Sequence, residues 1–61
     1  MKASKEQYEA YVRVQKSGDF NMFGPDAILA TGLDKETFFD IIENYALYVE
    51  KYEILKENNN G

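Results

Sequence analysis

The chain has no cysteine, no histidine and no tryptophan, and it contains a single proline. Without cysteine it forms no disulfide, and without cysteine or histidine it cannot build a Cys/His zinc site. A domain of 61 residues buries only about 60% of the surface that its unfolded chain exposes. Such a small core needs a supplement. Because disulfides and zinc are excluded, we expect self-association to supply it.

Long apolar runs are also missing. Uninterrupted apolar stretches, such as residues 27–30, fall far short of the roughly 20 residues that span a bilayer. The opening sequence, MKASKEQYEA, carries charges without an apolar region behind them, so we expect no signal peptide. The net charge of −4 and the pI of about 4.6 disfavour binding to nucleic acid or to anionic lipid. These features predict a soluble cytoplasmic protein that has protein partners and no membrane contact.

A first helix is predicted over residues 5–16. Ser4 is a suitable N-cap, and Gln7 three residues later completes a capping box. Tyr8 and the apolar residues that follow it recur at helical spacing. Gly18 suits the left-handed position just after a helix, so the helix is expected to end there.

Two further helices are predicted, over residues 25–31 and 34–56. Pro25 fits the first position of a helix, and Gly32 closes the short second helix. Asp34 is the predicted N-cap of the third helix, which at 1.5 Å per residue is roughly 34 Å long and overhangs the core. The apolar seam of this helix, with spacings of three and four, comprises Phe38, Ile42, Tyr45, Val49 and Tyr52.

The sequence thus predicts an all-α fold in one helical domain, residues 1–57, with a flexible tail at 58–61. The connection between the first two helices reads DFNMFG and is too apolar to be simply solvated. We expect its apolar side chains to plug the joint between the helices; they are Phe20, Met22 and Phe23.

Residues 27–38, AILATGLDKETF, have the spacing of a helix-turn-helix with its corner at Gly32 and Leu33. Such a unit is typically a DNA reader with its second helix in the major groove. Here that second helix is acidic, and an acidic helix repels phosphates. Its carboxylates are Asp34, Glu36, Asp40, Glu43, Glu50, Glu53 and Glu57, against Lys35, Lys51 and Lys56.

Three of these carboxylates, Glu36, Asp40 and Glu43, share one helix face at positions i, i+4 and i+7. Oxygen ligands at this spacing suit a divalent cation, and paired carboxylates also serve acid–base catalysis. A solvated helix face has the same pattern, and there is no histidine, no second carboxylate motif and no glycine-rich loop beside it. We therefore expect no metal, no cofactor and no catalytic residue, and we interpret this face as a partner-binding surface.

The five tyrosines are a strong bias in a chain without tryptophan. The first interpretation is a core in which the rings pack and the hydroxyls reach its edge; the alternative is an interface, where tyrosine is also enriched. For the carboxyl half of the third helix we favour self-association as a homodimer. The residues predicted to form that contact are Tyr45, Tyr48, Val49, Tyr52 and Leu55.

Several short motifs together carry a family resemblance: Tyr11–Val14, Ser17 and Gly18, Asn21–Gly24, Gly32 and Leu33, and Tyr45–Tyr52. With them the chain resembles a class of small helical proteins encoded in bacteriophage and prophage genomes. The resemblance implies an accessory phage protein in the cytoplasm of a bacterial host, where such products bind and redirect a host protein or act in local regulation.

Two functions follow as hypotheses from these observations. The favoured one is a noncatalytic protein-binding module that acts as a homodimer and meets a basic partner. The alternative is a small DNA-binding transcriptional regulator of helix-turn-helix type.

Overall fold

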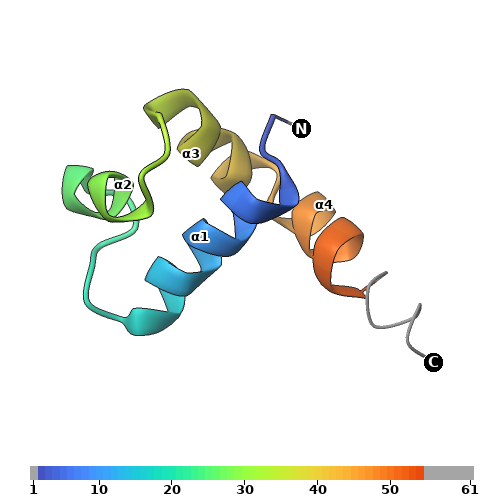
Figure 1. The fold of residues 1–61 in the computed structure, drawn as a ribbon, viewed down its shortest axis with the longest axis horizontal. Coiled ribbons are helices and arrows are strands. Elements are labelled where there is room, and N and C mark those ends of the chain that lie inside the picture. The colour runs from blue at the N-terminus through green and yellow to red at the C-terminus, as the bar shows by residue number, and fades with distance from the viewer. Residues whose placement is uncertain (1, 55–61) are drawn as a thin grey trace.

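The computed structural model describes residues 2–54 and contains helices only, so the predicted all-α class is confirmed. No strand occurs among these residues. The predicted tail at 58–61 lies outside the described residues. The elements, labelled in Figure 1, are α1 (Lys5–Ser17), α2 (Pro25–Thr31), α3 (Lys35–Glu43), α4 (Tyr45–Val49) and the π-helical turn η1 (Glu50–Ile54).

Helix α1 begins and ends as its sequence predicts. The Ser4 hydroxyl accepts a hydrogen bond from the Gln7 N–H at 3.2 Å, and the Ser4 N–H donates to Gln7 Oε1 at 2.9 Å. This capping box satisfies two backbone donors that a helix leaves free. At the other end Gly18 adopts φ 73°, a left-handed conformation that favours glycine. The helix is one residue longer than predicted.

Helices α2 and the start of α3 also confirm the local signals. Pro25 occupies the first turn of α2, and Gly32 ends that helix at φ 74°. Asp34 caps α3, because its carboxylate accepts from the Thr37 N–H at 3.2 Å and from the Thr37 hydroxyl at 2.6 Å. Leu33, between the two helices, packs against the core. Gly32 and Asp34 thus end α2 and cap α3 at the positions that the sequence predicts.

The predicted continuous helix over 34–56 is wrong, because α3 ends at Asn44. That residue has φ −116° and ψ 28°, outside the helical range. Its side-chain amide donates to the backbone oxygen of Asp40 at 3.1 Å and to Asp40 Oδ1 at 3.0 Å. Asparagine readily offers such a local alternative to the helical hydrogen bond. The chain then continues through α4 and η1 in a new direction (Figure 1), and residues 55–56 lie outside the described part.

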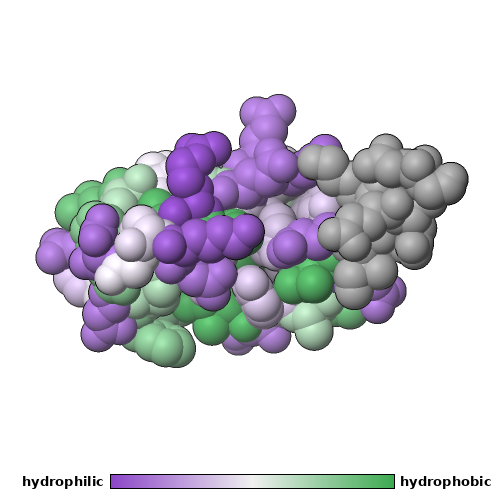
Figure 2. Space-filling model, turned by 90° about the horizontal axis from the view of Figure 1, so that it is seen from below, coloured by the Kyte–Doolittle hydropathy of each residue, from purple (hydrophilic) through white to green (hydrophobic). Residues whose placement is uncertain are grey.

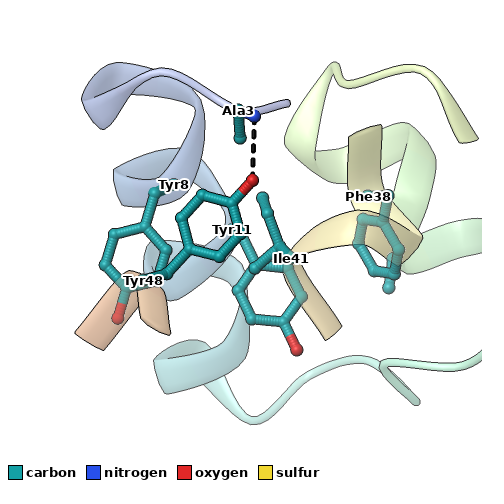
Figure 3. Close-up of a cluster of buried hydrophobic side chains, with 7 residues drawn as sticks. Ala3, Tyr8, Tyr11, Phe38, Ile41 and Tyr48 are labelled. Atoms are coloured by element: carbon teal, nitrogen blue, oxygen red, sulfur yellow. Dashed lines mark hydrogen bonds between the residues drawn. The ribbon is translucent and has the colours of Figure 1, made fainter. Parts of the chain in front are cut away.

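The core lies where α1 meets the other helices. Tyr8 of α1 stacks on Tyr48 of α4 with ring centroids 5.6 Å apart, and Tyr11 of α1 contacts Phe38 of α3 edge-on at 5.2 Å. The predicted tyrosine core is thus confirmed. Fully or nearly fully buried residues, most of them labelled in Figure 3, are Ala3, Tyr8, Tyr11, Ala27, Phe38, Ile41 and Tyr48.

Candidate functional site

Asp40, predicted to face a partner, is held by contacts within the chain. Its Oδ2 accepts from the Lys2 N–H at 2.8 Å and also from the Tyr48 hydroxyl, while Oδ1 accepts from the Asn44 amide. The Lys2 N–H, and next the Tyr48 hydroxyl, lower the pKa of Asp40 below its usual value. The Tyr48 hydroxyl in turn accepts from the Ala3 N–H at 2.9 Å, the dashed line in Figure 3. Asp40 therefore fastens residues 2 and 3 to the break between α3 and α4.

The other two residues of the predicted partner surface, Glu36 and Glu43, are exposed. Glu36 forms an ion pair with Lys2, and solvent screens such an exposed pair. Among residues 2–54 no group of carboxylates is gathered closely enough to hold a metal ion. The acidic face is thus divided: one carboxylate is engaged in the fold, one is paired at the surface, and Glu43 lies apart.

The residues predicted for self-association lie mostly within the folded chain. Tyr48 is completely buried, and Val49 and Tyr52 are half-buried against the core. Tyr45 is half-buried as well, and its hydroxyl donates to Gln15 Oε1 at 3.2 Å. The change of direction at Asn44 brings these side chains onto α1, which sequence periodicity did not indicate. The fifth predicted residue, Leu55, lies outside the described residues.

We call Tyr8, Tyr45, Tyr48 and Tyr52 the tyrosine cluster. Tyr8 is its centre, stacked on Tyr48 and, at 5.7 Å, on Tyr52, with Tyr45 tilted against it at 6.2 Å. The Tyr8 hydroxyl donates to Glu53 of η1. Burial, and next this hydrogen bond to a carboxylate, raise the pKa of Tyr8 far above its usual value. A phenol held neutral in this way supports the fold and is a poor nucleophile.

Every buried side-chain nitrogen or oxygen within the described residues has a hydrogen-bond partner. An orphaned buried polar group is a common mark of a catalytic or ligand site. The tyrosine cluster has none: besides the bonds already given, the Tyr52 hydroxyl reaches the Ala3 oxygen at 3.4 Å. We therefore assign the cluster a structural role.

A second region is built in the opposite way. Phe23, in the connection before α2, is 72% exposed, and Leu29 of α2 is 78% exposed. Phe20 is 38% exposed. These three residues, which we call the apolar end, belong to the α2 side of the molecule, away from α4 (Figure 1). Figure 2 shows hydrophobic atoms reaching the surface at that side.

The turn before α2 explains which of its apolar residues are covered. Asn21 organises the turn, because its side-chain oxygen accepts from the Phe23 N–H at 3.0 Å and its backbone oxygen accepts from the Gly24 N–H at 2.8 Å. Met22 packs against the core, as the plug hypothesis requires. Phe20 and Phe23 are exposed instead, so the hypothesis is wrong for those two residues.

Leu29 was not singled out by sequence reasoning, although a signal for it exists. Ala27 is fully buried and Ile28 packs against the core. At about 100° per residue, Leu29 lies about 200° around the helix from Ala27 and so points away from the core. Once Ala27 is placed on the buried face of α2, the rotation per residue places Leu29 on the outer face.

Two other exposed elements complete the surface. Leu47 of α4 is 53% exposed, on a different helix from the apolar end. At the start of α3, where a helix-turn-helix protein approaches DNA, Lys35 and Glu36 are both exposed. Within the described residues no helix combines the length and the apolarity that crossing a membrane requires.

No protein-family model, no curated protein and no solved structure matches the chain. Its function therefore has to be argued from its own surface and chemistry.

Proposed function

We propose that this chain is a noncatalytic protein-binding module, an accessory protein of a bacteriophage or prophage that works in the cytoplasm of the bacterial host. The observation that carries the proposal is the exposure of Phe23 and Leu29 in a chain that buries the rings of Tyr8, Tyr11, Phe38 and Tyr48. Exposed apolar side chains gathered at one end of a small domain mark an interaction site. The phage origin is supported by the sequence resemblance alone.

The energetics suit a modest but specific contact. Full burial of a Phe or Leu side chain contributes about 1.5–3 kcal/mol. Phe23 and Leu29 together therefore provide roughly 3–6 kcal/mol before the losses of freedom on association. Since a Kd of 1 μM corresponds to about 8 kcal/mol, additional contacts at the rim of the apolar end are required for micromolar binding.

A noncatalytic role is supported by the chemistry of the described residues. Burial raises the pKa of the Tyr8 and Tyr48 phenols, Asp40 is engaged in the fold, and the chain has no histidine or cysteine to serve as base or nucleophile.

The test is capture of a bacterial partner on immobilised protein. The wild type is expected to retain a discrete host protein, and the double variant Phe23→Ser/Leu29→Ser is expected to lose it. The control is Glu9→Ser, which changes an exposed side chain of α1 outside both proposed contacts and should leave capture intact. Equal retention by all three proteins would contradict the proposal.

We further propose that the module is a homodimer whose contact uses α4 and η1. Exposed Leu47 and half-buried Val49 and Tyr52 support this. Light scattering over a dilution series should give a dimer for the wild type and a monomer for Leu47→Lys. A wild type that is monomeric throughout the series would remove this part of the proposal.

The alternative function, DNA binding, is supported by the helix-turn-helix spacing of the sequence around Gly32, which ends α2 shortly before α3 begins, and by the exposure of Lys35 at the start of α3. It predicts retardation of DNA at about 50 mM salt, where electrostatic affinity is strongest, and loss of retardation in Lys35→Ala. Unretarded phage and host DNA would remove the alternative.

A further inference from the structure

The apolar end carries a charge pattern that indicates what kind of partner it binds. Between Lys16 and Lys35 the chain contains no basic residue and three acidic ones, Asp19, Asp26 and Asp34. The carboxylate of Asp34 caps α3. Asp19 and Asp26 are exposed, and they lie beside the apolar side chains: Asp19 precedes Phe20, and Asp26 is three residues before Leu29 on α2.

Asp26 shares a face with Leu29, since residues three apart on a helix are neighbours. Among residues 2–54 the recorded ion pair joins Lys2 and Glu36, so neither Asp19 nor Asp26 is paired with a cation of the described part. Their charges are therefore not neutralised by the fold. The apolar end is an apolar surface with a negative rim.

The outer face of α2 is exposed over both of its turns. Four residues of this face are exposed, and they form two pairs with a spacing of four: Pro25 with Leu29, and Asp26 with Ala30. Rows of side chains at this spacing form the ridges that pack into the grooves of a second helix. The small side chain of Ala30 leaves room beside Leu29 for a close approach.

We propose that the partner element bound here is a basic amphipathic helix, with apolar side chains on one stripe and Lys or Arg along its edges. This inference rests on the proposed function and specifies its partner. An apolar stripe covers Phe23 and Leu29, while the flanking cations meet Asp19 and Asp26. The negative rim repels three other candidate partners, because each is also negatively charged: the apolar end of a second copy, an anionic lipid surface and a nucleic acid.

The probes for the test are two synthetic helical peptides of equal length with the same leucine stripe. One carries Lys at the flanking positions and the other carries Glu. Binding to the full chain is followed by fluorescence polarisation of the labelled peptide. We expect the Lys peptide to bind at least about tenfold more tightly than the Glu peptide, and to weaken severalfold when salt is raised from about 50 to about 200 mM.

Variants then separate charge from apolar contact. Asp19→Asn/Asp26→Asn should weaken the Lys peptide about threefold to tenfold, while the control Glu9→Gln, an exposed carboxylate of α1, should leave it unchanged. Phe23→Ser/Leu29→Ser should abolish binding while the helical circular dichroism signal is retained.

Three results of the peptide experiments would overturn the inference. They are equal binding of the two peptides, no binding of either peptide, and Lys-peptide binding that survives Phe23→Ser/Leu29→Ser. Binding of the chain to vesicles of phosphatidylglycerol that is lost in that same variant would also overturn it, in favour of a membrane. Capture of a host partner tests the proposed function separately. If capture depends on Phe23 and Leu29 but the two peptides bind equally, the protein-binding function stands and only the inference of a basic helix is overturned.

Discussion

The two ends of the molecule use aromatic and apolar residues in opposite ways. In the tyrosine cluster every ring packs on another and Tyr48 is completely buried. At the apolar end Phe23 and Leu29 face outward, and the segment is held by backbone turns and glycine caps. The difference teaches that the chain separates the residues that hold the fold together from those available to a partner. The two groups can therefore be altered independently.

The largest loss of stability is expected from a substitution of Tyr48 in the tyrosine cluster. Tyr48→Ala leaves a cavity at the centre of the tyrosine cluster and should lower the free energy of unfolding by about 3–5 kcal/mol. For a domain whose total stability is about 5–15 kcal/mol, this is enough to unfold much of the population. Urea titration followed by circular dichroism measures the change.

The matched control for that experiment is Tyr48→Phe, which keeps the ring. It leaves the buried Ala3 N–H without its acceptor, so a smaller loss of about 1–3 kcal/mol is expected. Equal losses in both variants would show that the hydroxyl, not the ring, dominates.

Alkaline pH should destabilise the fold through its buried tyrosines. Burial, the first cause in each case, raises the pKa of Tyr8, Tyr11 and Tyr48 in the folded chain above the usual value of about 10. The stabilisation is full below pH 10 and is lost as pH rises above it, because the unfolded chain then releases protons that the folded chain retains. Tyrosinate absorbance and helical circular dichroism should therefore change together above pH 10. Ionisation of every tyrosine with the helical signal intact would contradict the buried cluster.

At the other end the largest expected loss comes from a glycine. Gly32→Ala places a side chain at φ 74°, which costs about 1–2 kcal/mol although the space around it is open. Gly32→Asn is the control, since asparagine tolerates the left-handed conformation better than alanine does, and a smaller loss is expected. Thermal unfolding compares them; equal melting temperatures would contradict the left-handed cap.

A smaller effect is expected at acid pH, because Asp40 is only half-buried. Its pKa is lowered in the folded chain, so its stabilisation is present above the unfolded value of about 4 and is lost as pH falls through the folded value. Asp40→Asn should be less stable than the wild type at neutral pH and should lose less stability between pH 5 and pH 2. An equal loss of stability in the two proteins between pH 5 and pH 2 would show that Asp40 does not make the described hydrogen bonds.

The smallest effect sharpens the comparison. Phe23→Ser/Leu29→Ser should change the free energy of unfolding by less than about 0.5 kcal/mol, because both side chains are largely exposed. The denaturant midpoint is the measurement. A loss comparable with that of Tyr48→Phe would mean that the apolar end packs within the chain.

Sequence reasoning succeeded where the controlling interactions are local. The Ser4 capping box, Pro25 at the start of α2 and the cap at Asp34 each depend on residues a few positions apart, and each is found where predicted. Composition also predicted that tyrosines form part of the core.

Sequence reasoning failed where contacts between residues far apart in the sequence determine the structure. The break at Asn44 brings Tyr48 back to Asp40 and Ala3, and an apolar seam has the same periodicity whether its helix is straight or interrupted. The assignment of Asp40 to an outward face ignored a partner 38 positions away, Lys2. Likewise composition showed that the connection before α2 is apolar, but only the turn at Asn21 decides that Phe23 is exposed.

The bonds from Ala3 to Tyr48 have a consequence for how the chain reaches its fold. They join residues 45 positions apart, so most of the domain must be synthesised before they can form. Helices α1 and α2, which are neighbours in sequence and in space, can associate earlier. Because closing a long loop is entropically unfavourable and slows folding, the docking of residues 2 and 3 is expected to be a late step. On the ribosome, a growing chain should therefore present its apolar end before its tyrosine cluster closes.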